Sequence, residues 1–178
     1  MKLRRQKPVS ARRPAVAALA LAVGLMQLLP AKMARAQPYD DLETRNLATV
    51  QAGFDAWRDG TGSPYDALAD DATWEITGTS VAARTYTGKE DFLANVIRPF
   101  NARMSTRLIP TIRDIYADGD TVIVFFDAEG TARDGIPYRN TYSWFLQLRD
   151  DKIVRASAFY DSIAFNDLWQ RVAPAPTP

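Results

Sequence analysis

Four segments with the composition of β-strands follow one another in the second half of this 178-residue chain. They comprise residues 106–116, 122–131, 138–148 and 152–160. The short connections between them are rich in Asp and Gly, which favour tight turns between antiparallel neighbours. The segments that come earlier are mainly helical in pattern. Helices followed by a run of antiparallel strands are typical of an α+β domain.

The helical segments carry one apolar face each and therefore need a surface to cover them. The first helix is predicted to begin at Asp40, because Asp40 and Glu43 have capping-box spacing. Its apolar stripe repeats at helical intervals and consists of Leu47, Val50, Phe54 and Trp57. A short helical turn is predicted at Pro64–Leu68, and a third helix after a capping box at Thr87–Glu90. We predict a strongly curved, mostly antiparallel sheet wrapped around the long N-terminal helix, which gives a cone-shaped fold with an apolar interior.

The first 36 residues have the pattern of a secretory signal peptide. A basic start is followed by the apolar run Ala15–Leu29 and by the small-residue site Ala34-Arg35-Ala36. As a helix the apolar run would span about 22 Å, less than the ~30 Å hydrocarbon core of a membrane. We predict a leader at 1–36, one domain at 37–172 and a disordered Pro-rich tail at 173–178. The protein would be exported to the periplasm or secreted, with an uncleaved anchor as the alternative.

Removal of the predicted leader changes the charge of the chain. The leader holds 8 of the 22 Lys and Arg residues and none of the 21 acids, so the remainder has 14 basic and 21 acidic residues, or −7. An acidic surface argues against nucleic acid or anionic lipid as a partner. The chain contains no Cys and no His, which disfavours zinc and copper sites. We predict no metal and no cofactor.

Without His or Cys, carboxylates are the main candidates for acid/base chemistry near neutral pH. Asp127 interrupts an apolar strand, and Asp161 directly follows another. A carboxylate buried in a sheet is costly unless it is paired, neutralised or facing a cavity. As alternatives, Asp161 could cap the final helix and Asp127 could pair with Arg139 or Arg107.

Side-chain alternation along strands assigns further residues to the interior. The predicted inward-facing residues are Trp74, Phe125, Asp127, Asn140, Tyr142, Trp144, Phe159 and Asp161. Tyr86, on the loop before the third helix, would close the mouth of the interior and could donate its hydroxyl to a ligand. If these faces meet, they form an aromatic pocket with carboxylates and an amide, suited to a small, mostly apolar ligand. The aromatic residues could equally be ordinary core residues.

The sequence resembles the nuclear transport factor 2-like superfamily, in particular its SnoaL-like and ketosteroid-isomerase-like branch. The residues that carry the resemblance are Leu68–Glu75, Tyr86–Glu90, Asn140–Trp144 and Lys152–Asp161. The resemblance implies the cone-shaped α+β fold. It does not imply one activity, because this fold hosts isomerases, cyclases, hydrolases and proteins that are not enzymes.

Comparison of family site residues with this chain narrows the expected chemistry. The position of the catalytic base of ketosteroid isomerases is occupied by Ile76, and that of their oxyanion-hole Asp by Trp144, so steroid isomerisation is not expected. The two carboxylates of limonene epoxide hydrolases correspond to Asp127 and Asp161, although their supporting residues correspond to Trp74, Ile76 and Phe125. Asp161 also matches an acidic residue of polyketide cyclases.

Two hypotheses follow from these observations. The first is a cofactor-free acid/base enzyme acting on a small apolar molecule, as isomerase, cyclase or epoxide-type hydrolase. Asp161 and Asp127 would be catalytic, and Tyr86 or Asn140 would orient the substrate. The second is a non-catalytic binding protein for a small molecule. In both cases we predict a homodimer formed through the exposed face of the sheet. The enzyme hypothesis requires at least one of the two aspartates to line the cavity.

Overall fold

The structure is a computed structural model that describes the backbone of residues 29–175 and the side chains of residues 41–175. Most of the predicted leader, residues 1–28, and the last three residues of the predicted tail lie outside this range. No helix within the described part of the chain combines the length and the hydropathy needed to cross a membrane. The description that follows concerns the compact unit that begins at Ala36.

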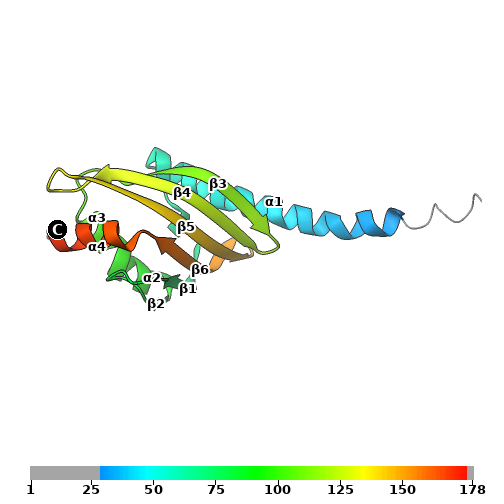
Figure 1. The fold of residues 1–178 in the computed structure, drawn as a ribbon. Helices are drawn as coiled ribbons and strands as arrows, with labels where there is room; N and C mark the ends of the chain where they lie inside the picture. The colour runs from blue at the N-terminus through cyan, green and yellow to red at the C-terminus, as the bar shows by residue number, and fades with distance from the viewer. Residues whose placement is uncertain (1–28, 176–178) are drawn as a thin grey trace, which may run out of the picture. The chain divides into compact units, whose positions relative to one another are not determined.

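A curved six-stranded sheet forms the centre of this unit, in the order β2–β1–β6–β5–β4–β3 (Figure 1). The strands are β1 (Leu68–Ile76), β2 (Thr85–Thr87), β3 (Ile109–Asp118), β4 (Thr121–Thr131), β5 (Pro137–Arg149) and β6 (Lys152–Tyr160). Within residues 29–175, β1 and β6 pair in parallel and every other neighbouring pair is antiparallel. The predicted α+β fold with a curved, mostly antiparallel sheet is therefore confirmed.

The helices differ from the prediction mainly at their ends. They are α1 (Leu29–Asp59), the 3-10 turn η1 (Pro64–Ala67), α2 (Lys89–Phe92), the π-helical segment η2 (Leu93–Ile97), α3 (Arg98–Asn101) and α4 (Ser162–Arg171). Helix α1 runs through Asp40, so the predicted start there is wrong. The N-cap of α2 is Gly88 rather than Thr87, because Thr87 belongs to β2, which was predicted as loop.

Helix α1 packs on one face of the sheet through aromatic contacts. The ring centroid of Phe54 lies 4.8 Å from that of Phe126 on β4 and 5.6 Å from that of Trp144 on β5. Two polar side chains of the same helix hold the β3–β4 turn. The Gly119 N–H donates to Glu43 Oε1 at 2.8 Å, and Asn46 Nδ2 donates to the Gly119 carbonyl at 3.3 Å. The helix is thus anchored to the sheet by both apolar and polar contacts.

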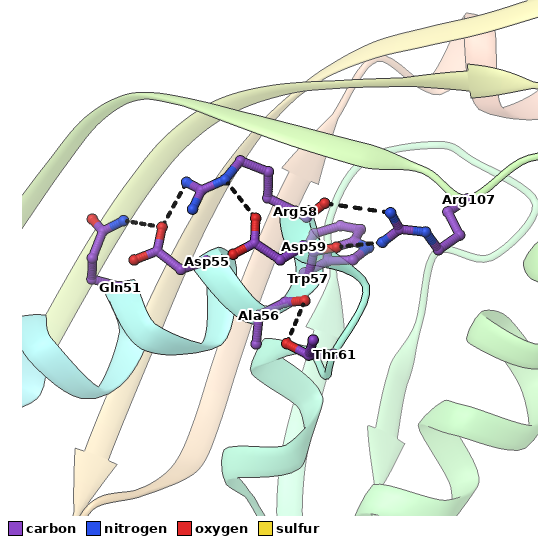
Figure 2. Close-up of polar contacts among 8 residues, drawn as sticks. All are labelled: Gln51, Asp55, Ala56, Trp57, Arg58, Asp59, Thr61 and Arg107. Carbon is purple, nitrogen blue, oxygen red and sulfur yellow. Dashed lines mark hydrogen bonds and ion pairs between the residues drawn. The ribbon is translucent and has the colours of Figure 1, made fainter.

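The C-terminal end of α1 is closed by Arg107, from the segment before β3 (Figure 2). Its Nη1 donates to the Trp57 carbonyl at 3.0 Å and its Nη2 to the Arg58 carbonyl at 3.5 Å. The last carbonyls of a helix lack i+4 donors, and a cation is favourable at this end of the helix dipole. The Trp57 carbonyl also accepts from the Gly60 N–H at 3.2 Å. Gly60, at φ +77°, leaves room for the guanidinium, with which a Cβ would clash. Arg107 thus joins the C-terminal end of α1 to the segment that leads into β3.

Pro99 explains the irregular helix between Lys89 and Asn101. A proline inside a helix cannot donate a hydrogen bond and clashes with the preceding turn. The chain accommodates Pro99 with the π-helical segment Leu93–Ile97 directly before α3. This widened turn carries Val96 and Ile97 toward the interior of the domain.

Candidate functional site

A small aromatic cavity lies on the α1 side of the sheet. Its volume is about 50 Å³. The walls come from separate elements, among them Tyr65 of η1, Trp74 of β1, Phe92 of α2, Tyr142 and Trp144 of β5, and Tyr160 of β6. Among the side chains that the structure describes, no Asp, Glu, His, Lys or Arg lines the cavity. The cavity is therefore apolar except for hydroxyl and indole groups.

Ring contacts between neighbouring aromatic residues hold the cavity walls in place. Trp74 stacks on Phe92 with centroids 4.3 Å apart and meets Trp144 edge-to-face at 5.0 Å. Trp57 stacks on Trp144 at 6.0 Å with an interplanar angle of 11°. Aromatic pairs in such geometries are stabilised beyond the area that they bury. The pocket is preformed by the core rather than by a loop.

An outer groove of about 600 Å³ adjoins the cavity. The two share five lining residues, which are Trp57, Tyr65, Ile97, Phe100 and Leu108. The outer groove is more polar and includes Asp66, Arg98 and Arg107. Figure 2 shows Arg107 beside Trp57 at the end of α1. A ligand could therefore reach the cavity from the outer groove past the shared residues.

The polar groups of the cavity are neutral near pH 7. Burial raises the pKa of the Tyr65 and Tyr160 hydroxyls and raises that of Tyr142 still more clearly. The indole Nε1 atoms of Trp74 and Trp144 are buried and have no hydrogen-bond partner among the described residues. These hydroxyl and indole groups can donate hydrogen bonds, but none of them can serve as a general base at neutral pH.

Asn140 is buried but does not line the cavity. Its Nδ2 donates to Tyr138 Oη at 2.9 Å and to the Asp161 carbonyl at 3.0 Å. Its Oδ1 accepts from the N–H of Thr141 at 2.8 Å and from the N–H of Asp161 at 3.0 Å. All four hydrogen-bonding positions of the amide are used. The residue predicted to contact a ligand is instead a clamp between β5 and the start of α4.

The predicted inward orientation of Phe125 and Asp127 is wrong. Val124 and Phe126, on either side of Phe125, are fully buried and face α1, so Phe125 and Asp127 lie on the opposite face. Arg113 Nε lies 2.6 Å from Asp127 Oδ2, and Thr141 Oγ1 donates to Oδ1 at 2.7 Å. The Thr141 hydrogen bond, followed by the Arg113 interaction, lowers the pKa of the Asp127 carboxyl. Asp127 is thus an ionised, paired surface residue.

The predicted inward orientation of Phe159 and Asp161 is also wrong. Ala156 and Ala158 are the buried residues of β6, and Phe159 points outward with 51% of its surface exposed. Asp161 is exposed and is the N-cap of α4, where its Oδ1 accepts from the Ile163 N–H at 2.8 Å. The alternative interpretation of Asp161 as a helix cap is therefore confirmed.

The two aspartates border one shallow groove of about 490 Å³ on the other face of the sheet, together with Arg113, Arg139 and the predicted site residue Asn140. Arg113 pairs with Asp127, and Arg139 Nε lies 3.1 Å from Glu129. The structure thus brings Asp127 and Asp161 to the same surface, but not to the aromatic cavity. This groove is lined mainly by charged and polar residues and does not resemble the predicted apolar pocket.

Tyr86 also lies away from the cavity. It belongs to β2, is 2% exposed, and donates its hydroxyl to the Ala82 carbonyl at 2.7 Å. The predicted site residues that do line the cavity are Trp74, Tyr142 and Trp144. Sequence reasoning missed Tyr65 and Tyr160 as cavity residues. Ala156, Ala158 and Tyr160 are every second residue of β6 and therefore share one face of the sheet. The two small alanines on that face could have indicated from the sequence that Tyr160 points inward.

Comparison with protein families gives a match to the SnoaL-like domain over residues 50–156. The chain belongs to this family. The matched segment of the SnoaL-like domain contains most of the cavity, including Tyr65, Trp74, Phe92, Tyr142 and Trp144. A comparison with curated proteins finds no match.

Solved structures confirm the fold of the SnoaL-like domain. Bal32a, from a soil-derived mobile gene cassette, has a TM-score of 0.61 at 18% identity, covering 72% of this chain and 98% of its own. A candidate SnoaL-like polyketide cyclase from Jannaschia sp. CCS1 has a TM-score of 0.58 at 18% identity, covering 77% and 96%. TerC, co-crystallised with polyporic acid, has a TM-score of 0.56 at 22% identity, covering 71% and 98%. At these identities the similarity extends to the fold alone.

Proposed function

We propose that this SnoaL-like domain binds a small, mainly apolar aromatic molecule in the cavity and does not use Asp127 or Asp161 for acid/base chemistry there. The observation that carries the proposal is the composition of the cavity, which is aromatic and without a charged residue. A general base has to reach the reacting proton directly or through one water. Both aspartates lie on the other face of the sheet, so the structure favours the binding hypothesis over the enzyme hypothesis.

The size of the cavity indicates how a ligand would sit. Ligand pockets are usually about 300–1,000 Å³, and the cavity alone has about 50 Å³. The outer groove, which shares five lining residues with the cavity, adds about 600 Å³. A ligand would therefore place one end in the cavity and the rest in the outer groove. The co-crystallisation of TerC with polyporic acid makes an organic ligand a reasonable expectation for this chain.

The site of action follows from the predicted leader. We propose that the domain works outside the cytoplasm, because residues 1–36 fit the secretory pattern. N-terminal sequencing of the protein from its own host should then give Gln37 as the first residue, and an intact leader would contradict the proposal.

Native mass spectrometry of protein purified from its own host should reveal a co-purified small molecule. Ala158→Leu adds three carbons to a lining residue that is 1% exposed, so this variant should lose the ligand. Ser157→Leu, on the opposite face of the same strand, is the matched control and should keep it.

Asp127→Asn and Asp161→Asn should bind within about twofold of the parent, because neither residue lines the cavity. A folded Asp161→Asn variant that lost binding or a turnover would restore the acid/base hypothesis.

The outer face of the sheet carries the aromatic side chains that the cavity does not use. Phe145 and Phe159 are 39% and 51% exposed, and their ring centroids lie 6.4 Å apart. We propose that this face forms a two-fold homodimer, since such an interface pairs one patch with itself.

Phe159→Glu would bring two negative charges into an apolar contact. Light scattering should show a dimer for the parent, a monomer for Phe159→Glu, and an unchanged dimer for Ile163→Glu, which alters an exposed residue of α4. A monomeric parent would refute the dimer.

A further inference from the structure

The π-helical segment η2 lies in the wall between the aromatic cavity and the outer groove. Val96 lines the cavity, Leu93 lines the outer groove, and Ile97 lines both. The turn is closed by the Arg98 N–H, which donates to the Leu93 carbonyl five residues back. Such turns are rare and occur frequently at functional sites. The irregular part of the helical stretch 89–101 therefore coincides with the boundary between the two spaces.

Both ends of this helical stretch are tied to the sheet by backbone hydrogen bonds. Before it, the Gly88 N–H donates to the Ala72 carbonyl of β1 at 2.9 Å, and after it, the Ser105 N–H donates to the Thr131 carbonyl of β4 at 2.9 Å. Within the described structure, the hydrogen bonds of residues 92–101 stay inside the stretch between these two ties. The backbone of η2 lies mainly beside α2 and α3. The middle of the stretch is thus held against the domain by side-chain packing.

Two phenylalanines on either side of η2 make the aromatic contacts of this stretch with the sheet. Phe92 stacks on Trp74 with ring centroids 4.3 Å apart, and Phe100 meets Tyr138 edge-to-face at 5.2 Å. The five residues of η2 itself are four aliphatic residues and Asn95. A short segment with anchored flanks and few hydrogen bonds to its surroundings opens at a smaller free-energy cost than the whole domain. The wall of the cavity is therefore weakest at η2.

The closed cavity has about 50 Å³, which is less than the usual size of a ligand pocket, about 300–1,000 Å³. We propose, resting on the proposed binding function, that η2 is a gate. It moves away from the sheet to admit a ligand from the outer groove and closes again over the end that has entered the cavity. The gate is a conformational device that uses the π-turn as its movable part.

Two features of the stretch set the cost of opening in opposite directions. Pro99 lowers the cost, because it has no N–H to donate to the Asn95 carbonyl, as a regular helix would require. Glu90 and Arg98 raise the cost, because their side chains span the π-turn. Arg98 Nη1 donates to Glu90 Oε1 at 2.5 Å, and Arg98 Nη2 donates to Glu90 Oε2 at 2.9 Å. Each feature can be removed by one substitution.

Hydrogen exchange of the ligand-free protein tests whether η2 opens. The amides of residues 93–98 should exchange faster than those of β4 and α4, at a rate that low urea concentrations leave unchanged, because the opening is local. Pro99→Ala restores the helical N–H and should slow this exchange about tenfold. Glu90→Gln should accelerate it by up to about fivefold, the range for an exposed ion pair. The matched control is Glu129→Gln, which removes the exposed pair with Arg139 on the other face of the sheet and should change nothing.

Binding kinetics test whether the opening admits a ligand. 1-Naphthol is the probe, and stopped-flow fluorescence of the tryptophans that line the cavity follows its entry. A gate that is closed both before and after binding changes entry and release together. Pro99→Ala should therefore lower both rate constants and Glu90→Gln should raise both, with Kd within about twofold of the parent. A change in release alone, with entry unaltered, is the signature of a static wall contact and would overturn the gate.

The gate and the proposed binding function fail in different ways. Exchange at residues 93–98 as slow as in β4 would overturn the gate, whereas a ligand co-purified from the host would still support the binding function. Protein that carries no ligand from its host and does not bind 1-naphthol would overturn both, because an opening that admits nothing is not a gate.

Discussion

Phe126→Ala is expected to lower the free energy of unfolding by about 3–5 kcal/mol, the range for removal of a fully buried aromatic side chain. Phe126 is 0% exposed and lies at the centre of the contact between α1 and the sheet. Its ring centroid is 4.8 Å from Phe54, 4.8 Å from Tyr142 and 4.9 Å from Trp144. The change would leave an empty volume behind the residues that hold the cavity. Urea unfolding followed by circular dichroism measures the loss.

The matched control is the neighbouring residue on the opposite face. Phe125 is only half-buried, with the guanidinium carbon of Arg113 5.0 Å from its ring centroid. Phe125→Ala should cost about 1 kcal/mol or less, as is usual for partly exposed positions. Both variants should be compared in the Phe159→Glu background, so that a dimer contact does not enter the measurement. A Phe125→Ala variant as unstable as Phe126→Ala would mean that β4 presents its other face to α1.

These two phenylalanines also show why part of the site could not be predicted. The segment Val122–Phe126 is apolar at every position, so its alternation does not say which face is buried, and a shift of one residue exchanges the faces. The prediction chose the face that placed Asp127 inside. In β5, by contrast, Tyr142 and Trp144 alternate with polar Thr141 and Ser143, and this face was predicted correctly.

Fold and site were predictable to different degrees for a physical reason. Strand order and turns depend on local signals, such as the Asp-Gly turn at Gly119 and the paired aspartates Asp150 and Asp151, which adopt positive φ angles of 52° and 59°. The cavity instead depends on which side chains from separate elements meet. Tyr65, on a four-residue turn, had no periodic neighbours to reveal its direction. The two aspartates were identified by their chemistry, but surface pairing and helix capping account for them.

Asn140→Leu is expected to destabilise the domain by about 2–4 kcal/mol and to loosen α4. The change removes four hydrogen bonds and leaves the backbone N–H of Asp161 without its partner, at about 1–3 kcal/mol for a buried unsatisfied group. The Asp161 carbonyl keeps only the Phe165 N–H, at 3.3 Å, as its donor. Hydrogen exchange in α4 should accelerate more than in β4. Thr141→Val, which removes only the contact with Asp127, should cost less than about 1 kcal/mol and leave exchange in α4 unchanged.

The effect of Asn140→Leu on ligand binding shows whether Asn140 is a structural clamp or contacts the ligand. Helix α4 supplies Phe165 to the cavity wall, so loss of the clamp should weaken binding of the co-purified ligand in proportion to the loosening of α4. Asn140→Asp keeps the two acceptor positions and loses the two donors, so its stability should lie between those of the parent and Asn140→Leu. If Asn140→Leu left α4 protected against exchange and yet lost the ligand, the amide would belong to the ligand site, as first predicted from the sequence.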